Sequence, residues 1–61
     1  MSTIEDCRRI LNLSQEDVAN TVNISRQYYN AIENRKRKPS VELAKRLAKV
    51  LKTEWTIFFT D

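Results

Sequence analysis

The side chains best suited to chemistry in this 61-residue chain gather between residues 26 and 38. Five basic residues fall in that segment against the single acid Glu33, namely Arg26, Arg35, Lys36, Arg37 and Lys38. The segment is therefore more positive than the whole chain, whose net charge is +3. Such a cluster attracts a polyanion, although a run of this kind can also be an ordinary solvated loop.

The residue types that are missing exclude most catalytic and cofactor chemistry. The chain has no His, no Gly and a single Cys, Cys7. Without His there is no Ser-His-Asp arrangement and no imidazole base. Without Gly there is no phosphate-cradling loop or dinucleotide fingerprint. One Cys forms neither an internal disulfide nor a multi-cysteine zinc site. We expect no enzyme activity, no metal and no cofactor.

The elements that position the basic segment are predicted to be helices. No segment alternates strictly as a strand does, and apolar residues recur at helical spacing. Ser14, Ser25 and Ser40 precede such segments and are predicted N-caps, and Thr53 is predicted to cap a last turn. The sequence predicts one all-α domain over residues 1–61 with five short helices, at about 4–11, 15–22, 26–34, 41–51 and 54–59. In the first helix Ile10 belongs to the apolar face, and in the fourth an apolar stripe begins at Val41. No window approaches the ~20 apolar residues of a membrane span, so we expect no membrane partner.

The second and third predicted helices are joined by the short segment 23–25. Helix, short turn and helix is the form of a helix-turn-helix, whose second helix presents its N-terminal side chains to the major groove of DNA. In that helix Tyr29 and Ile32 are predicted to face inward, while Arg26, Gln27 and Asn30 face outward.

The chain resembles the Cro/C1-type helix-turn-helix family of phage and bacterial repressors. The matching stretches are residues 13–19 (LSQEDVA), 22–29 (VNISRQYY), 32–34 (IEN), 39–41 (PSV) and 55–59 (WTIFF). The resemblance covers about residues 4–59 and implies a lambda repressor-like DNA-binding domain with helices 2 and 3 as the helix-turn-helix. It also implies a place in the bacterial cytosol, including that of a phage-infected host.

The resemblance implies a DNA-contacting role for particular residues. Base contacts fall to Arg26, Gln27, Asn30 and Ala31. Arg pairs with guanine, Gln and Asn pair with adenine, and Ala meets the thymine methyl. Asn30 is as readily interpreted as a plain helix-surface residue. For Ala31 the plain interpretation is favoured, because a small residue is also a good helix former. Phosphate contacts fall to a larger set: Ser14, Gln15, Tyr28, Asn34, Arg35, Lys36, Arg37 and Lys38.

The resemblance also implies two structural features. Arg8 on the first helix and Glu33 near the end of the third are expected to form a partly buried ion pair. The family commonly has Gly at four helix ends, which are here Asn12, Asn23, Arg35 and Lys52. Asn tolerates the left-handed conformation, whereas Arg and Lys suit it less. The third helix is therefore expected to end either at Arg35 or one residue earlier, with Asn34 left-handed.

Two hypotheses of function follow. The first is a sequence-specific transcriptional regulator, most simply a repressor, that binds a two-fold symmetric double-stranded DNA operator as a homodimer, at least on DNA. Trp55 and Phe59 are the predicted dimer contacts. The alternative is a protein-interaction module of the same fold, antitoxin-like or anti-repressor in role, whose main partner is a protein.

Overall fold

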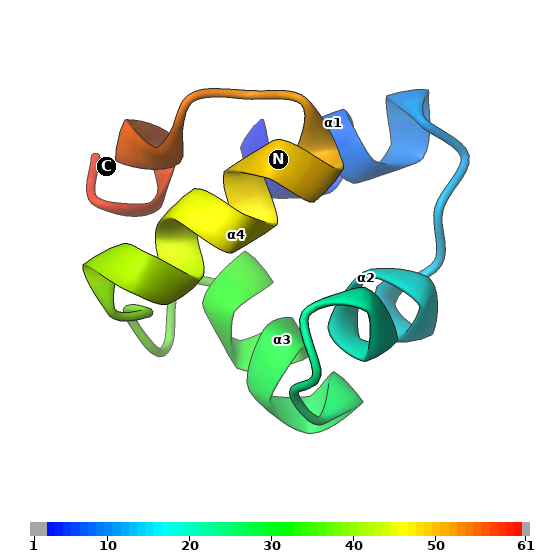
Figure 1. The fold of residues 1–61 in the computed structure, drawn as a ribbon, viewed down its shortest axis with the longest axis horizontal. Coiled ribbons are helices and arrows are strands. Elements are labelled where there is room, and N and C mark those ends of the chain that lie inside the picture. The colour runs from blue at the N-terminus through cyan, green and yellow to red at the C-terminus, as the bar shows by residue number, and fades with distance from the viewer. Residues whose placement is uncertain (1–2, 61) are drawn as a thin grey trace.

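Four α-helices and a closing 3₁₀ turn make up residues 3–60, the part of the chain that the computed structural model describes. In chain order they are α1 (Thr3–Ile10), α2 (Gln15–Thr21), α3 (Arg26–Glu33), α4 (Val41–Leu51) and η1 (Trp55–Phe58). Helix α4 runs across the molecule, with α1 and η1 on one side of it and α2 and α3 on the other (Figure 1). The all-helical architecture is the one that the sequence predicts.

The prediction of five helices is wrong in its last member, because η1 is a single 3₁₀ turn. Its N-cap is Glu54, not Thr53, and no side chain caps the turn. The four residues are aromatic or β-branched, and these types lose side-chain freedom in a helix. Without a cap, so short a segment does not nucleate an α-helix.

Serine side chains start three of the helices. The Oγ atoms of Ser14, Ser25 and Ser40 each accept a hydrogen bond from the backbone N–H three residues later, at 3.0, 3.0 and 3.1 Å. Asp17 returns a bond from its carboxylate to the N–H of Ser14 at 3.0 Å, which completes a capping box. These bonds lower the Asp17 pKa. Each such cap stabilises its helix by about 1 kcal/mol.

All four α-helices end in the same left-handed closure, although none of them ends in Gly. The left-handed residues are Asn12, Asn23, Arg35 and Lys52, with φ of 59°, 64°, 62° and 55°. The residue after each one donates its N–H to the carbonyl five residues earlier, at 2.8–3.2 Å. This is the bond of a Schellman motif, which satisfies helix carbonyls that would otherwise lack partners.

The alternative that α3 closes on a left-handed Asn34 is wrong, because Asn34 has φ of −88°. Arg35 donates its N–H to the carbonyl of Ile32 at 3.1 Å, and Lys36 donates to that of Ala31 at 2.8 Å. This pair of bonds requires the left-handed residue at position 35. A non-glycine residue there costs roughly 1–2 kcal/mol, so the closure outweighs the local strain.

The core forms where α4 meets the other helices. Five residues of α4 are buried, namely Leu43, Ala44, Leu47, Ala48 and Leu51. Residues from the rest of the chain complete the core: Ile4, Val18, Ala19, Val22, Tyr29, Ile32 and Phe58. Cys7 is half-buried and packs against this cluster.

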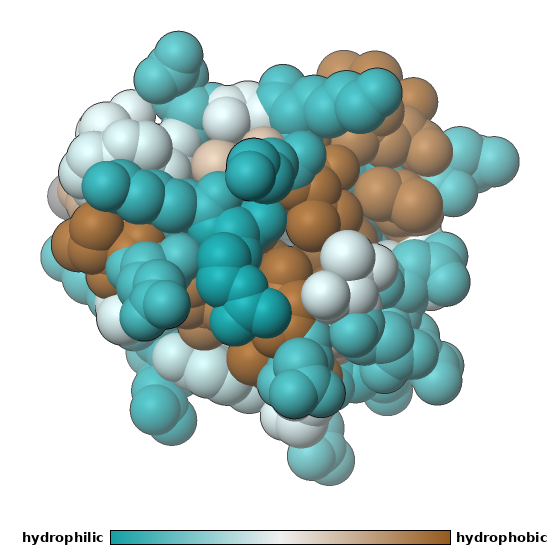
Figure 2. Space-filling view, viewed as in Figure 1, coloured by the Kyte–Doolittle hydropathy of each residue, from teal (hydrophilic) through white to brown (hydrophobic). Residues whose placement is uncertain are grey.

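Two apolar residues that the sequence pattern predicts to face the core are exposed. Val41 is 50% exposed and Ile10 is 82% exposed. Each lies at the end of its helix, where the apolar stripe runs past the edge of the core. In the view of Figure 2, apolar surface gathers over the carboxyl end of α1.

The left-handed Lys52 predicts a stabilising substitution. Lys52→Gly should raise the free energy of unfolding by about 1 kcal/mol, because glycine avoids the left-handed penalty of roughly 1–2 kcal/mol and loses part of that gain to its own chain entropy. Lys49→Gly, in the exposed interior of α4, is the matched control and should lower it by about 1 kcal/mol. Urea unfolding measures both. Equal losses in the two variants would contradict the prediction.

Candidate nucleic-acid interface

Helix α3 has a polar, exposed side and a side that is buried in the core. Tyr29 and Ile32 are 0% and 2% exposed and anchor the helix to the core. Arg26, Gln27 and Asn30 are all exposed on the other side. Ala31, predicted to share that surface, is only half-exposed.

The turn that leads into α3 is held from two directions. Arg46 of α4 donates from Nη2 to the carbonyl of Val22 at 3.0 Å. Ile24 is half-buried and packs against the core. These contacts attach the turn between α2 and α3 to α4 and to the core.

The basic loop after α3 is attached back to the first turn of that helix. Lys36, Arg37 and Lys38 are exposed, and the guanidinium of Arg37 lies 5.3 Å from the centroid of the Tyr28 ring. A cation–π contact at an exposed site stabilises by about 0.5–1 kcal/mol. Tyr28 thus brings the positive charge of the loop towards the N-terminal half of α3.

Arg35 behaves differently from the rest of the basic run. Its Nη1 donates to the carbonyl of Thr60, so its side chain reaches towards the end of the described chain. Arg35 is predicted from the sequence to contact phosphate together with Lys36, Arg37 and Lys38. In the structure its guanidinium is hydrogen-bonded to the segment after η1.

A buried ion pair lies beneath α3. Glu33 is 2% exposed. Its Oε2 accepts from Arg8 Nε at 2.8 Å and its Oε1 from Arg8 Nη2 at 3.2 Å. Arg8 also donates from Nη1 to the carbonyl of Leu13 at 2.8 Å. This bidentate geometry is the strong form of the Arg–carboxylate contact, and it joins α1 to α3.

Amide side chains extend this pair to the surface. Gln15 donates from Nε2 to Glu33 Oε1 at 3.0 Å. Asn30 then donates from Nδ2 to Gln15 Oε1 at 3.2 Å, and Asn34 donates from Nδ2 to Asn30 Oδ1 at 3.2 Å. The sequence shows the i,i+4 spacing of Asn30 and Asn34, but not the crossing of α2 and α3 that brings Gln15 between Asn30 and Glu33.

The two residues at the start of α2 are engaged within the protein. Ser14 Oγ serves the cap, and the Gln15 amide bonds to Glu33 and Asn30. Glu16 and Asp17 follow in the same turn, and their negative charges oppose the approach of a phosphate.

The hydrogen bonds around Glu33 keep its carboxylate charged. Burial is the largest influence and raises the pKa, but the bonds from Arg8 and Gln15 together bring the pKa below its ordinary value. The Arg8 pKa is raised in turn, chiefly by its hydrogen bond to Glu33. Burial, and then the neighbouring Glu33, raise the pKa of the Tyr29 hydroxyl, which has no geometrically acceptable hydrogen-bond partner within residues 3–60.

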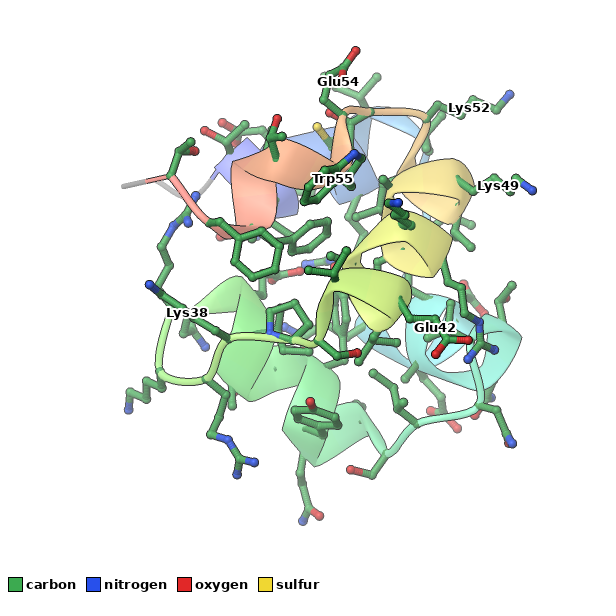
Figure 3. All side chains as sticks on the ribbon, turned by 60° about the vertical axis from the view of Figure 1, so that its left-hand side comes forward. Lys38, Glu42, Lys49, Lys52, Glu54 and Trp55 are labelled. Carbon is green, nitrogen blue, oxygen red and sulfur yellow. The ribbon has the colours of Figure 1, made fainter. Side chains whose placement is uncertain are left out.

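Trp55 and Phe59 lie together, on η1 and directly after it. Their rings meet edge to face with centroids 5.9 Å apart. Lys45 of α4 places its Nζ 5.3 Å from the Trp55 ring centroid. Figure 3 shows Trp55 on the opposite side of the molecule from α3, near Glu54, while Lys49 and Lys52 extend outward from the carboxyl-terminal part of α4.

Residues 3–60 hold no group of three or more His, Cys, Asp or Glu side chains that could bind a metal. None of the helices described is long and apolar enough to cross a membrane.

The sequence of this chain is similar to those of known helix-turn-helix proteins. The model of a helix-turn-helix family matches residues 4–58. Over 48 residues the chain is 50% identical to YqaF, an uncharacterized HTH-type transcriptional regulator of Bacillus subtilis (strain 168). That alignment covers 79% of this chain and 63% of the relative, so the chain spans somewhat less than two thirds of the protein that it matches.

The buried pair predicts a large loss of stability in Glu33→Ala. Removing one partner of a buried pair costs about 3–5 kcal/mol, while a chain of this size has only about 0.05–0.15 kcal/mol of stability per residue. Thermal unfolding should show a strongly lowered melting temperature, and the effect on stability should exceed any effect on DNA preference. Glu16→Ala, at an exposed position, should change stability by no more than about 0.5 kcal/mol. An unchanged melting temperature in Glu33→Ala would refute the role of the pair.

The same pair predicts a dependence on acid. Because the Glu33 pKa is lower in the folded than in the unfolded chain, its contribution to stability is present above the unfolded pKa, about 4.3 for Glu, and is lost as pH falls through the folded pKa. The neutral variant Glu33→Gln should therefore show a flatter fall of unfolding free energy below that pH. Asp17, whose pKa is also lowered, contributes equally to both proteins. Parallel curves would contradict this assignment.

Proposed function

Because the chain belongs to the Cro/C1-type helix-turn-helix family, we propose that it is a sequence-specific transcriptional repressor that reads the major groove of DNA with α3. The observation that carries the proposal is the placement of Arg26, Gln27 and Asn30 on the exposed side of a helix whose other side is locked into the core. The similarity to an HTH-type transcriptional regulator supports it. We place its action in the bacterial cytosol.

The chemistry of these side chains fits base recognition. Arg26 offers two parallel donors to the O6 and N7 acceptors of guanine, and Gln27 and Asn30 each offer one donor and one acceptor to adenine. Arg26 and Gln27 lie in the first turn of α3, where helix-turn-helix proteins meet base edges. Ala31 is proposed only as an apolar contact to a thymine methyl, since it is half-covered.

The basic loop fits the phosphate backbone beside the groove. Lys36, Arg37 and Lys38 are proposed to bind phosphates, with Tyr28 holding Arg37 in place and Asn34 at the start of the loop. Each phosphate that a cation neutralises releases counterions, so that binding weakens with added salt. These contacts position α3 but carry no sequence information.

The division of labour between helix and loop is testable by paired variants. The double variant Arg26→Ala, Gln27→Ala should lose its preference for a selected operator over scrambled DNA, because base contacts are removed. Lys36→Ala should weaken binding to both DNAs, and its plot of log affinity against log salt should be shallower by about 0.9, because one phosphate contact is lost.

Sites selected from random DNA supply the operator, and fluorescence titration over a range of salt measures both variants. A double variant that keeps the wild-type preference would exclude α3 as the reading element. In that case, stoichiometric capture of a protein partner by the wild type would support the interaction-module alternative.

We also propose that the repressor binds a two-fold symmetric operator as a homodimer, with the half-sites about 34 Å apart, one helical turn of DNA. The contact surface is assigned to Trp55 and Phe59. These half-buried rings lie on η1 and directly after it, on the side of α4 away from α3 (Figure 1). Charges of both signs lie near Trp55, from Lys45 of α4 and from Glu54 (Figure 3). Mixed charge suits an interface in which the same patch meets itself.

The dimer contact predicts a loss of cooperativity. Trp55→Ala should bind a single half-site with wild-type affinity but lose the extra affinity of the wild type for the full operator, because the second copy no longer gains a protein contact. Ile10→Ser changes an exposed apolar residue elsewhere and serves as the control. Titrations of half-site and full-site DNA, on variants whose folding is checked by circular dichroism, make the measurement. Unchanged cooperativity in Trp55→Ala would remove Trp55 from the interface.

A further inference from the structure

Gln15 stands between a buried charge and the surface of α3 that is proposed to read bases. Its Nε2 donates to Glu33, which is 2% exposed, and its Oε1 accepts from Asn30, which is exposed. Gln15 itself is half-buried. It therefore connects the interior of the protein to the outer side of α3 through a single side chain.

The chemistry of Glu33 sets the direction of every bond in this series. An ionised carboxylate only accepts hydrogen bonds, so Gln15 must turn its NH₂ group inward and its oxygen outward. The outward oxygen pairs only with a donor, so Asn30 must present its own NH₂ group to it. The oxygen of Asn30 then faces the NH₂ group of Asn34 at 3.2 Å. Amide orientation, which is otherwise assigned from surrounding partners, is dictated here by the buried charge.

Asn30 keeps the capacity to bind a base in this arrangement. Its NH₂ group has two hydrogens and its oxygen two lone pairs, and the contacts to Gln15 and Asn34 use one of each. One donor and one acceptor remain. These are what an Asn needs to pair with N7 and N6 of adenine.

We propose that Gln15 is a positioning residue for base recognition, which holds the Asn30 amide in one donor–acceptor order and so sharpens the preference of α3 for the base that Asn30 meets. A held amide meets adenine in one orientation, whereas a freely turning amide offers both orders and discriminates less. The inference rests on the proposed function, since it requires that Asn30 faces DNA.

This role differs from that of a phosphate ligand. A Gln that binds phosphate turns its NH₂ group towards the DNA, because phosphate oxygens are acceptors. Gln15 turns its oxygen outward instead, and the acidic residues Glu16 and Asp17 share its turn of α2. The two roles therefore predict different results for the same substitution.

The test is a double-mutant cycle on four proteins: wild type, Gln15→Ala, Asn30→Ala and the double variant. Each is titrated with the selected operator and with versions that carry the other three base pairs at the position where Asn30→Ala abolishes preference. Gln15→Ala should reduce discrimination at that one position by about tenfold, within the range of a bidentate base contact. In the Asn30→Ala background, adding Gln15→Ala should reduce it no further.

A matched control and a measurement without DNA complete the design. Glu16→Ala alters the exposed neighbour and should leave discrimination at that position unchanged. In the free protein, Gln15→Ala should shift the side-chain NH₂ resonances of Asn30 in an amide NMR spectrum, and Glu16→Ala should not. All titrations are made at a temperature where thermal unfolding shows each variant to be folded.

The outcomes separate cleanly. A uniform loss of affinity for every base, repeated in the Asn30→Ala background, would make Gln15 a phosphate contact and overturn the inference. Unshifted Asn30 resonances in Gln15→Ala would overturn it as well. A wild-type protein that selects no preferred site would instead refute the proposed function, and that result is visible in the wild-type arm alone.

Discussion

The structure depends on the burial of one carboxylate, that of Glu33. Among residues 3–60 it is the only charged side chain that is buried. An unpaired charge in that position would be strongly destabilising. Its partners come from two other helices, Arg8 from α1 and Gln15 from α2. Satisfying a single buried charge therefore requires α1, α2 and α3 to meet in one arrangement. The apolar core is less selective, because apolar contacts have no direction.

The second constraint is that four helices must end sharply within a short chain. Each closure uses a left-handed residue, and here none of the four is Gly. Asn12 and Asn23 adopt this conformation at modest cost. Arg35 and Lys52 are strained, but each closure supplies a carbonyl with a backbone donor from the following residue. Arg35 gains a further contact to Thr60, which offsets part of its strain. The fold thus tolerates local strain because its helix ends are satisfied by backbone bonds.

Much of the fold follows from sequence because its signals are local. Ser14, Ser25 and Ser40 begin helices through bonds to residues only three positions away, and such bonds depend little on the rest of the chain. The failures occur at the ends of elements. Periodicity predicts the apolar stripe that begins at Val41, but it does not say where along the helix the core ends. The apolar residues within 55–58 pack against the core, but they are poor helix formers. This segment therefore forms a single 3₁₀ turn and not an α-helix.

The candidate interface was predictable as a set of residues but not as a set of contacts. Exposure of Gln27 follows from its place opposite Tyr29 on the helix, and exposure of Arg26 follows from its place as the first residue of α3. The link from Glu33 through Gln15 to Asn30 depends on the crossing of α2 and α3, which no spacing along the chain encodes.

The hydrogen bonds from Glu33 through Gln15 to Asn30 also indicate which residues serve stability and which serve recognition. Glu33 contributes to both, so a change there cannot separate them. Gln15 lies one bond nearer the surface and is half-buried, so the structure can lose its side chain and keep the Arg8–Glu33 pair intact. Recognition is therefore best altered at Gln15 and Asn30, because substitutions there leave the bidentate contact between Arg8 and Glu33 in place.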